Sequence, residues 1–314
     1  NMTLEEGKPA LLQFNYFPGK PTNTPSLGIV AQDKLVDPAA IRFAKMADAV
    51  VLSVGFSPAT ESEGRDRTYQ LPFGQEELIR EVTAANPKTI VVLTAGGSVA
   101  TQDWIDRTPA LLQTWYGGQE AGTALAKLLF GDANPSGKLP ISWAKRVQDN
   151  PTYKTYYELE GTRNIKYSEG VFIGYRYYET SDVKPLFPFG FGLSYTSFAF
   201  SNLSVSPQTA SANGPIEVGF DVRNIGLVTG AEVAQVYVGD PSATVKRPKM
   251  ELKGFSRVML RPGEVHHVTV TLDKRSLAYW DTTTHGWKVD PGKFLVSVGD
   301  SSENVPLQQD FTVQ

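Results

Sequence analysis

The chain has 314 residues, a length that is long for one compact core and sufficient for two domains. Hydrophobic residues make up 41% of it and charged residues 20%, a composition that excludes a disordered tail. The formal net charge of -3 argues against a nucleic-acid-binding surface, and no apolar run approaches the ~20 residues that cross a bilayer. We therefore expect neither a nucleic-acid partner nor a membrane partner.

Cysteine is absent and histidine is scarce. The lack of cysteine excludes disulfides, zinc-thiolate sites and cysteine nucleophiles. The three histidines, His266, His267 and His285, fall in a strand-rich region with turn residues around them. We interpret them as solvated strand residues rather than bases or ligands. No metal and no organic cofactor is implied.

The first half of the chain alternates apolar runs with helical patterns. Residues 49–55 form a short β-rich run that ends in glycine, as a strand buried on both faces does. Residues 75–86 have helical spacing, 89–94 read as a second strand and 111–116 as a third, and 121–130 read as a helix before Gly131. This order predicts an α/β domain with a mainly parallel sheet and helices on both faces.

Two loops of that domain qualify for chemistry. In parallel sheets, functional groups lie on loops beyond the carboxyl ends of the strands, here after Gly55 and after Thr94. The second loop contains Gly96-Gly97-Ser98, but no Lys-Ser or Lys-Thr pair follows, which excludes a P-loop. We therefore expect the chemistry in the loop after Gly55.

The second half consists of short alternating strands. The clearest are residues 216–222, 232–238, 264–272 and 293–298, separated by turn signals such as Asp-Pro and Pro-Gly. This spacing predicts an all-β immunoglobulin or fibronectin type III-like sandwich after the sheet domain.

Four parts of the chain follow from these patterns. We expect a poorly readable N-terminal segment of the sheet domain at 1–43, the α/β domain at 44–183, a packed linker at 184–196 and the sandwich at 197–314. The linker is rich in Pro, Gly and Phe, too apolar for a free connection, so it should pack against both domains. Because the chain opens with Asn1-Met2, we expect it to be a piece of a longer polypeptide.

The loop after the first strand concentrates charge. Glu61, Glu63 and Asp66 alternate there with Arg65 and Arg67. Neighbouring carboxylates raise one another's pKa, while arginines keep one of them ionised, so the parts of a proton donor are present. A solvated surface loop is the alternative interpretation, and composition does not separate the two.

Four stretches, in the same order, resemble family 3 glycoside hydrolases of the β-glucosidase type. They are ESEGRDR with LP and QEELI (61–79), WYGGQEAG with GDANPSGKLP (115–140), YSEGVFIGYRYY (167–178) and PLFPFGFGLSYT (185–196). The resemblance covers the chain from about residue 44 to its end. It implies the C-terminal portion of a retaining exo-β-glycosidase, specifically a β-glucosidase, acting on a β-linked oligosaccharide or glucoside. Many members are exported, so export is expected over the cytoplasm.

The resemblance implies that the catalytic acid/base is Glu61 or Glu63. Some members match Glu61 without gaps as far as Leu71-Pro72, whereas members with a Glu-Gly-x-Asp-Arg core match Glu63. We retain both, and the gapless match favours Glu61. The other glutamate would be a charge partner of Arg65 or Arg67.

The nucleophile is expected outside this chain. In the resembled family it is an aspartate in an Asp-Trp context within a preceding TIM-type barrel, which is the expected partner of this portion. Asp103-Trp104 repeats that dipeptide, but we interpret Asp103 as a helix-start residue. The alternatives are a non-catalytic carbohydrate-binding or scaffold remnant and a related specificity such as β-xylosidase. An oligomer is compatible with all of these.

Aromatic residues offer a second route to sugar binding. Trp115 and Tyr116 in the sheet domain, and Tyr279, Trp280 and Trp287 in the sandwich, have side chains that stack on sugars. We predict that both groups fill hydrophobic cores instead.

Overall fold

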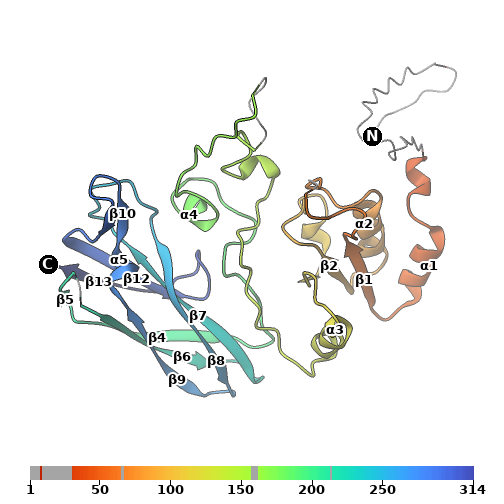
Figure 1. The fold of residues 1–314 in the computed structure, drawn as a ribbon. Helices are drawn as coiled ribbons and strands as arrows, with labels where there is room; N and C mark the ends of the chain where they lie inside the picture. Colours follow the sequence, from red (N-terminus) through yellow and green to blue (C-terminus); the bar gives the residue numbers. More distant parts are fainter. Residues whose placement is uncertain (1–7, 9–29, 65–66, 157–161, 213) are drawn as a thin grey trace.

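A computed structural model describes residues 8, 30–64, 67–156, 162–212 and 214–314. An α/β unit and a β-sandwich lie side by side, joined by a long connecting segment that runs between them (Figure 1). Within these residues, no helix combines the length and the apolar character needed to span a membrane.

The α/β unit contains a three-stranded parallel sheet in the order β1-β2-β3. Its strands are β1 Val50–Gly55, β2 Thr89–Thr94 and β3 Ala110–Gln113. The central strand β2 is the most buried, because a neighbour pairs with each of its edges. The predicted parallel sheet is confirmed.

Three longer helices accompany the sheet: α1 Pro38–Met46, α2 Gln75–Ala85 and α3 Ala121–Phe130. Asp37 caps α1, which was not predicted because its first half lies in the poorly readable segment 1–43. Asn86 follows α2 and donates to the carbonyl groups of Ala44 and Ala47, which joins α2 to the end of α1. The helices predicted at 75–86 and 121–130 are confirmed, and Gly131 ends α3 with φ 81°.

The prediction that β1 is buried on both faces is wrong for the described part of the chain. Leu52 and Val54 face the core under α2, but Val51 on the opposite face is 50% exposed. The apolar run alone does not reveal this, because β1 is an edge strand and no described helix covers Val51.

The connecting elements are short. They are the 3₁₀ helices η1 Gln32–Lys34, η2 Ile105–Arg107 and η3 Val147–Asp149, and the single-turn helix α4 Tyr175–Tyr178. Two fully buried tryptophans complete the core of the α/β unit: Trp104, which precedes η2, and Trp143, which donates to the carbonyl of Val99 at 2.9 Å.

The sandwich consists of two described sheets, in the orders β5-β13-β12-β7-β8 and β4-β6-β9. Their strands are β4 Phe198–Ser206, β5 Thr209–Ala210, β6 Ile216–Asn224, β7 Gly230–Gly239, β8 Glu251–Leu260, β9 Val265–Leu272, β12 Gly292–Gly299 and β13 Leu307–Val313. A short helix α5 Lys274–Leu277 and a hairpin of β10 Tyr279–Asp281 and β11 Gly286–Lys288 accompany them.

Alternating side chains from both sheets form the core of the sandwich. Val218 and Phe220 of β6 face Val236 of β7 and Phe294 and Val296 of β12, all at most 1% exposed. All strand pairs except β13 with β5 are antiparallel. The predicted sandwich is confirmed.

The segment 185–192 contacts both units. Phe187 and Trp143 form a backbone bridge, and their rings meet edge to face at 6.2 Å between centroids. On the other side, the Gln235 side chain donates to the carbonyl of Gly190 at 3.2 Å, and the Ser302 amide donates to the carbonyl of Phe189 at 2.9 Å. The boundaries at 43, 183 and 196 stay predictions.

Candidate active site

Three loops meet at the carboxyl ends of β1, β2 and β3. Gly55 ends β1 with φ 139°, and a Cβ there would collide with the backbone of Thr94 on β2. Only glycine therefore allows the chain to leave the sheet so close to its neighbour. The Gln75 side chain fixes this exit, since it accepts from the Gly55 amide at 2.7 Å and donates to the Gly55 carbonyl at 2.9 Å.

The Glu61 carboxylate accepts hydrogen bonds from all three loops. Arg67, in its own loop, donates from Nε to Oε1 at 2.9 Å. The Gly96 amide, beyond β2, donates to Oε2 at 3.1 Å, and the Tyr116 hydroxyl, beyond β3, donates to the same oxygen. We call Glu61, Arg67, Gly96 and Tyr116 the Glu61 network.

Arg67 uses each of its guanidinium nitrogens. Besides Nε to Glu61, Nη2 donates to the carbonyl of Ser98 at 2.9 Å and Nη1 to the carbonyl of Thr68 at 3.0 Å. The guanidinium also lies over the ring of Phe56, 4.6 Å from its centroid. Arg67 therefore connects the far end of the charged loop to the loop after β2.

Gly96 and Gly97 leave the space that the two side chains occupy. A Cβ on Gly96 would lie 2.9 Å from Oε1 of Glu61, and one on Gly97 would lie 3.2 Å from Nη2 of Arg67. The glycine pair, for which the sequence excluded a P-loop, is thus a packing requirement of the network.

The network keeps Glu61 ionised. Partial burial raises the pKa of Glu61, but the hydrogen bonds from Tyr116, Gly96 and Arg67 outweigh it, so its pKa lies below the ordinary value of 4.5. Tyr116 shows the reciprocal effect, since burial and its bond to the carboxylate raise the pKa of its hydroxyl.

Glu63 has a different environment from Glu61. Its side chain is exposed, and among the described residues it has no hydrogen bond or ion pair. Arg65, one of its two predicted charge partners, and Asp66 lie outside the described residues. Among the described residues, the loop thus carries one carboxylate with several donors and one exposed carboxylate with none.

A hollow of about 1100 Å³ opens beside the Glu61 network. The loops contribute Glu61, Arg67, Gly97 and Ser98 to its lining, and the connecting segment contributes Tyr153, Tyr175 and Arg176 among others. Tyr69 also lines the hollow, and its hydroxyl donates to the carbonyl of Ala144 at 2.8 Å. Glu61 therefore adjoins a space of ligand size, whereas Glu63 is not among the residues that line it.

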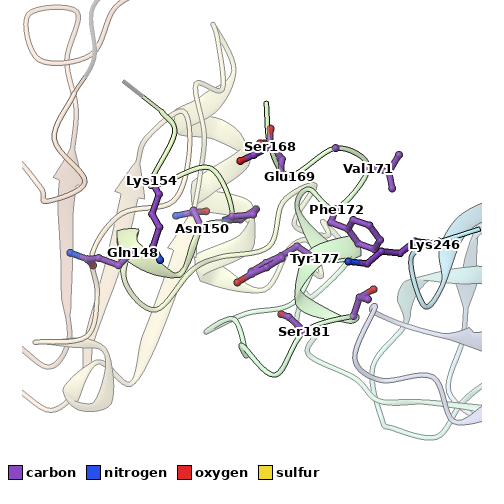
Figure 2. Close-up of a pocket in the computed structure, with 13 residues that line it drawn as sticks. Gln148, Asn150, Lys154, Ser168, Glu169, Val171, Phe172, Tyr177, Ser181 and Lys246 are labelled. Carbon is purple, nitrogen blue, oxygen red and sulfur yellow. The ribbon is translucent and has the colours of Figure 1, made fainter. Parts of the chain in front are cut away.

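A second hollow, of about 770 Å³, is lined by the connecting segment and by Lys246 of the sandwich (Figure 2). Lys154 and Gln148 lie on one side of it, and Phe172, Tyr177 and Lys246 lie on the other (Figure 2). Lys246 belongs to the sandwich and lies 4.9 Å from the centre of the Phe172 ring. Neither Glu61 nor Glu63 lines this hollow.

Three sequence-based interpretations are corrected. Asp103 is not a helix cap: η2 begins after Trp104, and no side chain caps it. Tyr116 does not fill the core but is 56% exposed, because its hydroxyl must reach Glu61. Trp280 and Trp287 are 48% and 43% exposed, because the β10–β11 hairpin lies outside the two main sheets.

The histidines lie outside the Glu61 network. His266 and His267 lie exposed on β9, as predicted, and His267 pairs with Asp221 at 2.7 Å; His285 lies in the turn between β10 and β11. Across the described residues, no group of three or more His, Cys, Asp or Glu side chains is arranged to hold a metal ion.

The roles of Gly96 and Tyr116 were not predicted from the sequence. Both lie beyond the carboxyl ends of predicted strands, so strand order offered a signal for them. No pattern along the chain indicates that they contact Glu61, because they are 35 and 55 positions away from it.

Comparison with known proteins explains this arrangement of domains. Residues 20–195 match the glycosyl hydrolase family 3 C-terminal domain, and residues 232–302 match a fibronectin type III-like domain. Thermostable beta-glucosidase B of Acetivibrio thermocellus is 43% identical over 271 residues, which cover 86% of this chain and 36% of that protein. Probable beta-glucosidase I of Aspergillus terreus is 42% identical over 292 residues, covering 91% of this chain and 34% of that protein.

Solved structures agree with these matches. The family 3 beta-glucosidase of Bifidobacterium adolescentis superposes with a TM-score of 0.85 at 39% identity, over 92% of this chain and 42% of its own. The beta-glucosidase of Kluyveromyces marxianus in complex with glucose gives a TM-score of 0.83 at 38% identity, over 91% of this chain and 34% of its own. The chain spans about a third of the length of the curated relatives it matches. Because the family's C-terminal domain matches more than half of it, this chain belongs to glycosyl hydrolase family 3.

Proposed function

We propose that this chain is the acid/base-bearing part of a retaining β-glucosidase that removes terminal β-glucosyl residues. The observation that carries the proposal is the loop beyond β1, which, in a chain of glycosyl hydrolase family 3, presents two carboxyl groups of contrasting environment: Glu61 lines a hollow, and Glu63 is exposed. The names of the relatives, all beta-glucosidases in the comparisons above, support the substrate class.

The proposed reaction has two steps. An aspartate of a preceding TIM-type barrel, outside this chain, attacks the anomeric carbon while a glutamate of the loop protonates the departing glycosidic oxygen. In the second step the same glutamate, now ionised, takes a proton from water, and that water releases the glucosyl group from the aspartate. The barrel and the glucoside are therefore the proposed partners of this portion.

Of the two candidates, the hydrogen bonds favour Glu63 as the proton donor. Glu61 accepts from a guanidinium, an amide and a hydroxyl, all of which stabilise its ionised form, whereas a donor must hold a proton. Oε2 of Glu61 already accepts two of these bonds, which leaves little room for a glycosidic oxygen. Glu63 is exposed and has no described partner. The gapless match had favoured Glu61, so both enter the test.

The test compares Glu61→Ala with Glu63→Ala in the protein that contains both this chain and the portion preceding it. We expect Glu63→Ala to lower kcat/KM for cellobiose by roughly 10²- to 10⁴-fold, the usual contribution of a general acid. Hydrolysis of 2,4-dinitrophenyl β-glucoside should lose far less in its first step, because that leaving group needs no proton. Added azide should restore turnover and yield glucosyl azide.

Glu217→Ala is the matched control, since Glu217 is an exposed glutamate on β6 of the sandwich. If Glu61→Ala instead loses kcat/KM selectively for cellobiose and is rescued by azide, Glu61 is the proton donor. Equal loss on both substrates in both variants would contradict the acid/base role of this loop. If the complete protein bound glucosides without hydrolysing them, the non-catalytic alternative would replace the proposal.

A further inference from the structure

The described structure fixes the charged loop at two points. At one point Glu61 accepts from residues beyond β2 and β3, and at the other Arg67 donates to Ser98 beyond β2. Five sequence positions separate these two residues, and Glu63 is one of them. Fixing both ends of so short a segment restricts the positions open to Glu63.

The two fixed residues also hold each other, since Arg67 Nε donates to Glu61 Oε1 at 2.9 Å. The side chain of Arg67 is 16% exposed and that of Glu61 is 20% exposed, so water competes only partly for their hydrogen-bonding groups. Charge-assisted bonds of this kind are shorter and stronger than those between neutral groups. The two ends of the segment are therefore held together as well as to the sheet.

We propose that Glu61, Arg67 and Tyr116 are positioning residues that set the reach of the Glu63 carboxyl toward the departing oxygen. This inference rests on the proposed function. Its physical basis is that general acid catalysis requires the proton within hydrogen-bond reach of its acceptor, and a displacement of ~1 Å costs on the order of 10²-fold in rate.

Tyr116 provides the most selective perturbation. Its ring is 56% exposed, and Tyr116→Phe removes only the hydroxyl that donates to Glu61. The remaining donors, Arg67 and Gly96, still hold Glu61 in its ionised form. The substitution should therefore loosen the network without unfolding the domain.

Gly96→Ala perturbs the network from the opposite side. The new Cβ would lie 2.9 Å from Oε1 of Glu61 and 3.2 Å from Cε2 of Tyr116, so both side chains must shift. Gly96 does not have a positive φ, so alanine adds a steric conflict without backbone strain. Tyr116→Phe and Gly96→Ala thus form a series of rising severity.

The experiment measures kcat/KM for cellobiose and for 2,4-dinitrophenyl β-glucoside in the complete protein. We expect the ratio of the first to the second to fall by about 3- to 10-fold in Tyr116→Phe and by about 10- to 50-fold in Gly96→Ala, in keeping with displacements of a fraction of an ångström to 1 Å. Azide should not rescue either variant, because each retains the proton donor. Tyr167→Phe, at an 81% exposed tyrosine outside the network, should leave the ratio unchanged.

A purely structural role for the network would lower both kcat/KM values equally, or the thermal midpoint alone, and would overturn the inference. So would an unchanged ratio in Gly96→Ala. Failure of the proposed function is seen separately, in Glu63→Ala: if that variant shows neither selective loss nor azide rescue, the proton donor is wrongly assigned. If Glu63→Ala behaves as expected while the ratio is constant across the series, only the positioning role fails.

Discussion

Gln235 of β7 is the residue whose replacement should most disturb the contact between the sandwich and the segment 185–192. Its side chain is 3% exposed and makes three hydrogen bonds. Nε2 donates to the carbonyl groups of Gly190 at 3.2 Å and Asp300 at 2.5 Å, and Oε1 accepts from the Tyr237 hydroxyl at 2.5 Å. The side chain therefore joins the connecting segment to β7 and to Asp300, the residue that follows β12.

Replacement of Gln235 by leucine should lower the free energy of unfolding by about 3–6 kcal/mol. Leucine has a similar volume, so the loss arises from the three polar groups that lose their partner. An unpaired buried group costs roughly 1–3 kcal/mol, and the lower half of that range, taken for three groups, gives about 3–6 kcal/mol. Tyr237→Phe removes only one of these bonds and should cost about 1 kcal/mol. For a sandwich of this size the larger loss corresponds to a fall of roughly 10–20 °C in the thermal midpoint.

Differential scanning calorimetry of the chain, following the transition of the sandwich, measures both effects. Gln308→Leu is the matched control, because Gln308 is an exposed glutamine on β13. A Gln235→Leu midpoint within about 2 °C of that control would refute the reasoning, since it would mean that the three groups find other partners. A large fall in Tyr237→Phe with a small one in Gln235→Leu would refute it as well.

Two further predictions concern the Glu61 carboxylate and the sandwich core. Because the pKa of Glu61 is depressed in the folded chain, its ionised form stabilises the fold above pH 4.5, and that contribution is lost as the pH falls through the folded-state pKa. The difference in thermal midpoint between the wild type and Glu61→Gln should therefore be present at pH 7 and disappear on acidification. A difference that stays constant with pH would contradict this prediction. Phe220→Ala, at a fully buried ring of β6, should cost about 3–5 kcal/mol in urea unfolding, against less than ~0.5 kcal/mol for Phe255→Ser at a ring that is 67% exposed.

Local patterns were sufficient for much of the fold. The apolar run that forms β2 and the helical spacing of α2 predicted a parallel sheet, because strands of such sheets are buried on both faces and read as near-continuous runs of apolar, β-branched residues. In the sandwich, β6 alternates buried and exposed residues, as a strand with one face in a core must. Strand β8 was not among the predicted strands, because its alternation of apolar and polar residues is obscured. Phe255 and Met259 are apolar but exposed, at positions where an alternating strand has polar residues.

The sequence by itself determined that Glu61 and Glu63 occupy a charged loop beyond the first strand, and it identified the family by resemblance. Only the tertiary structure decided how the two glutamates differ. Two residues apart, they have nearly the same neighbours along the chain, but Glu61 alone meets Gly96 and Tyr116. Those contacts exist because parallel strands end at one edge of the sheet, which brings donors 35 and 55 positions away within reach of one carboxylate. A carboxyl group's pKa and freedom depend on such neighbours in space, and not on its neighbours in sequence.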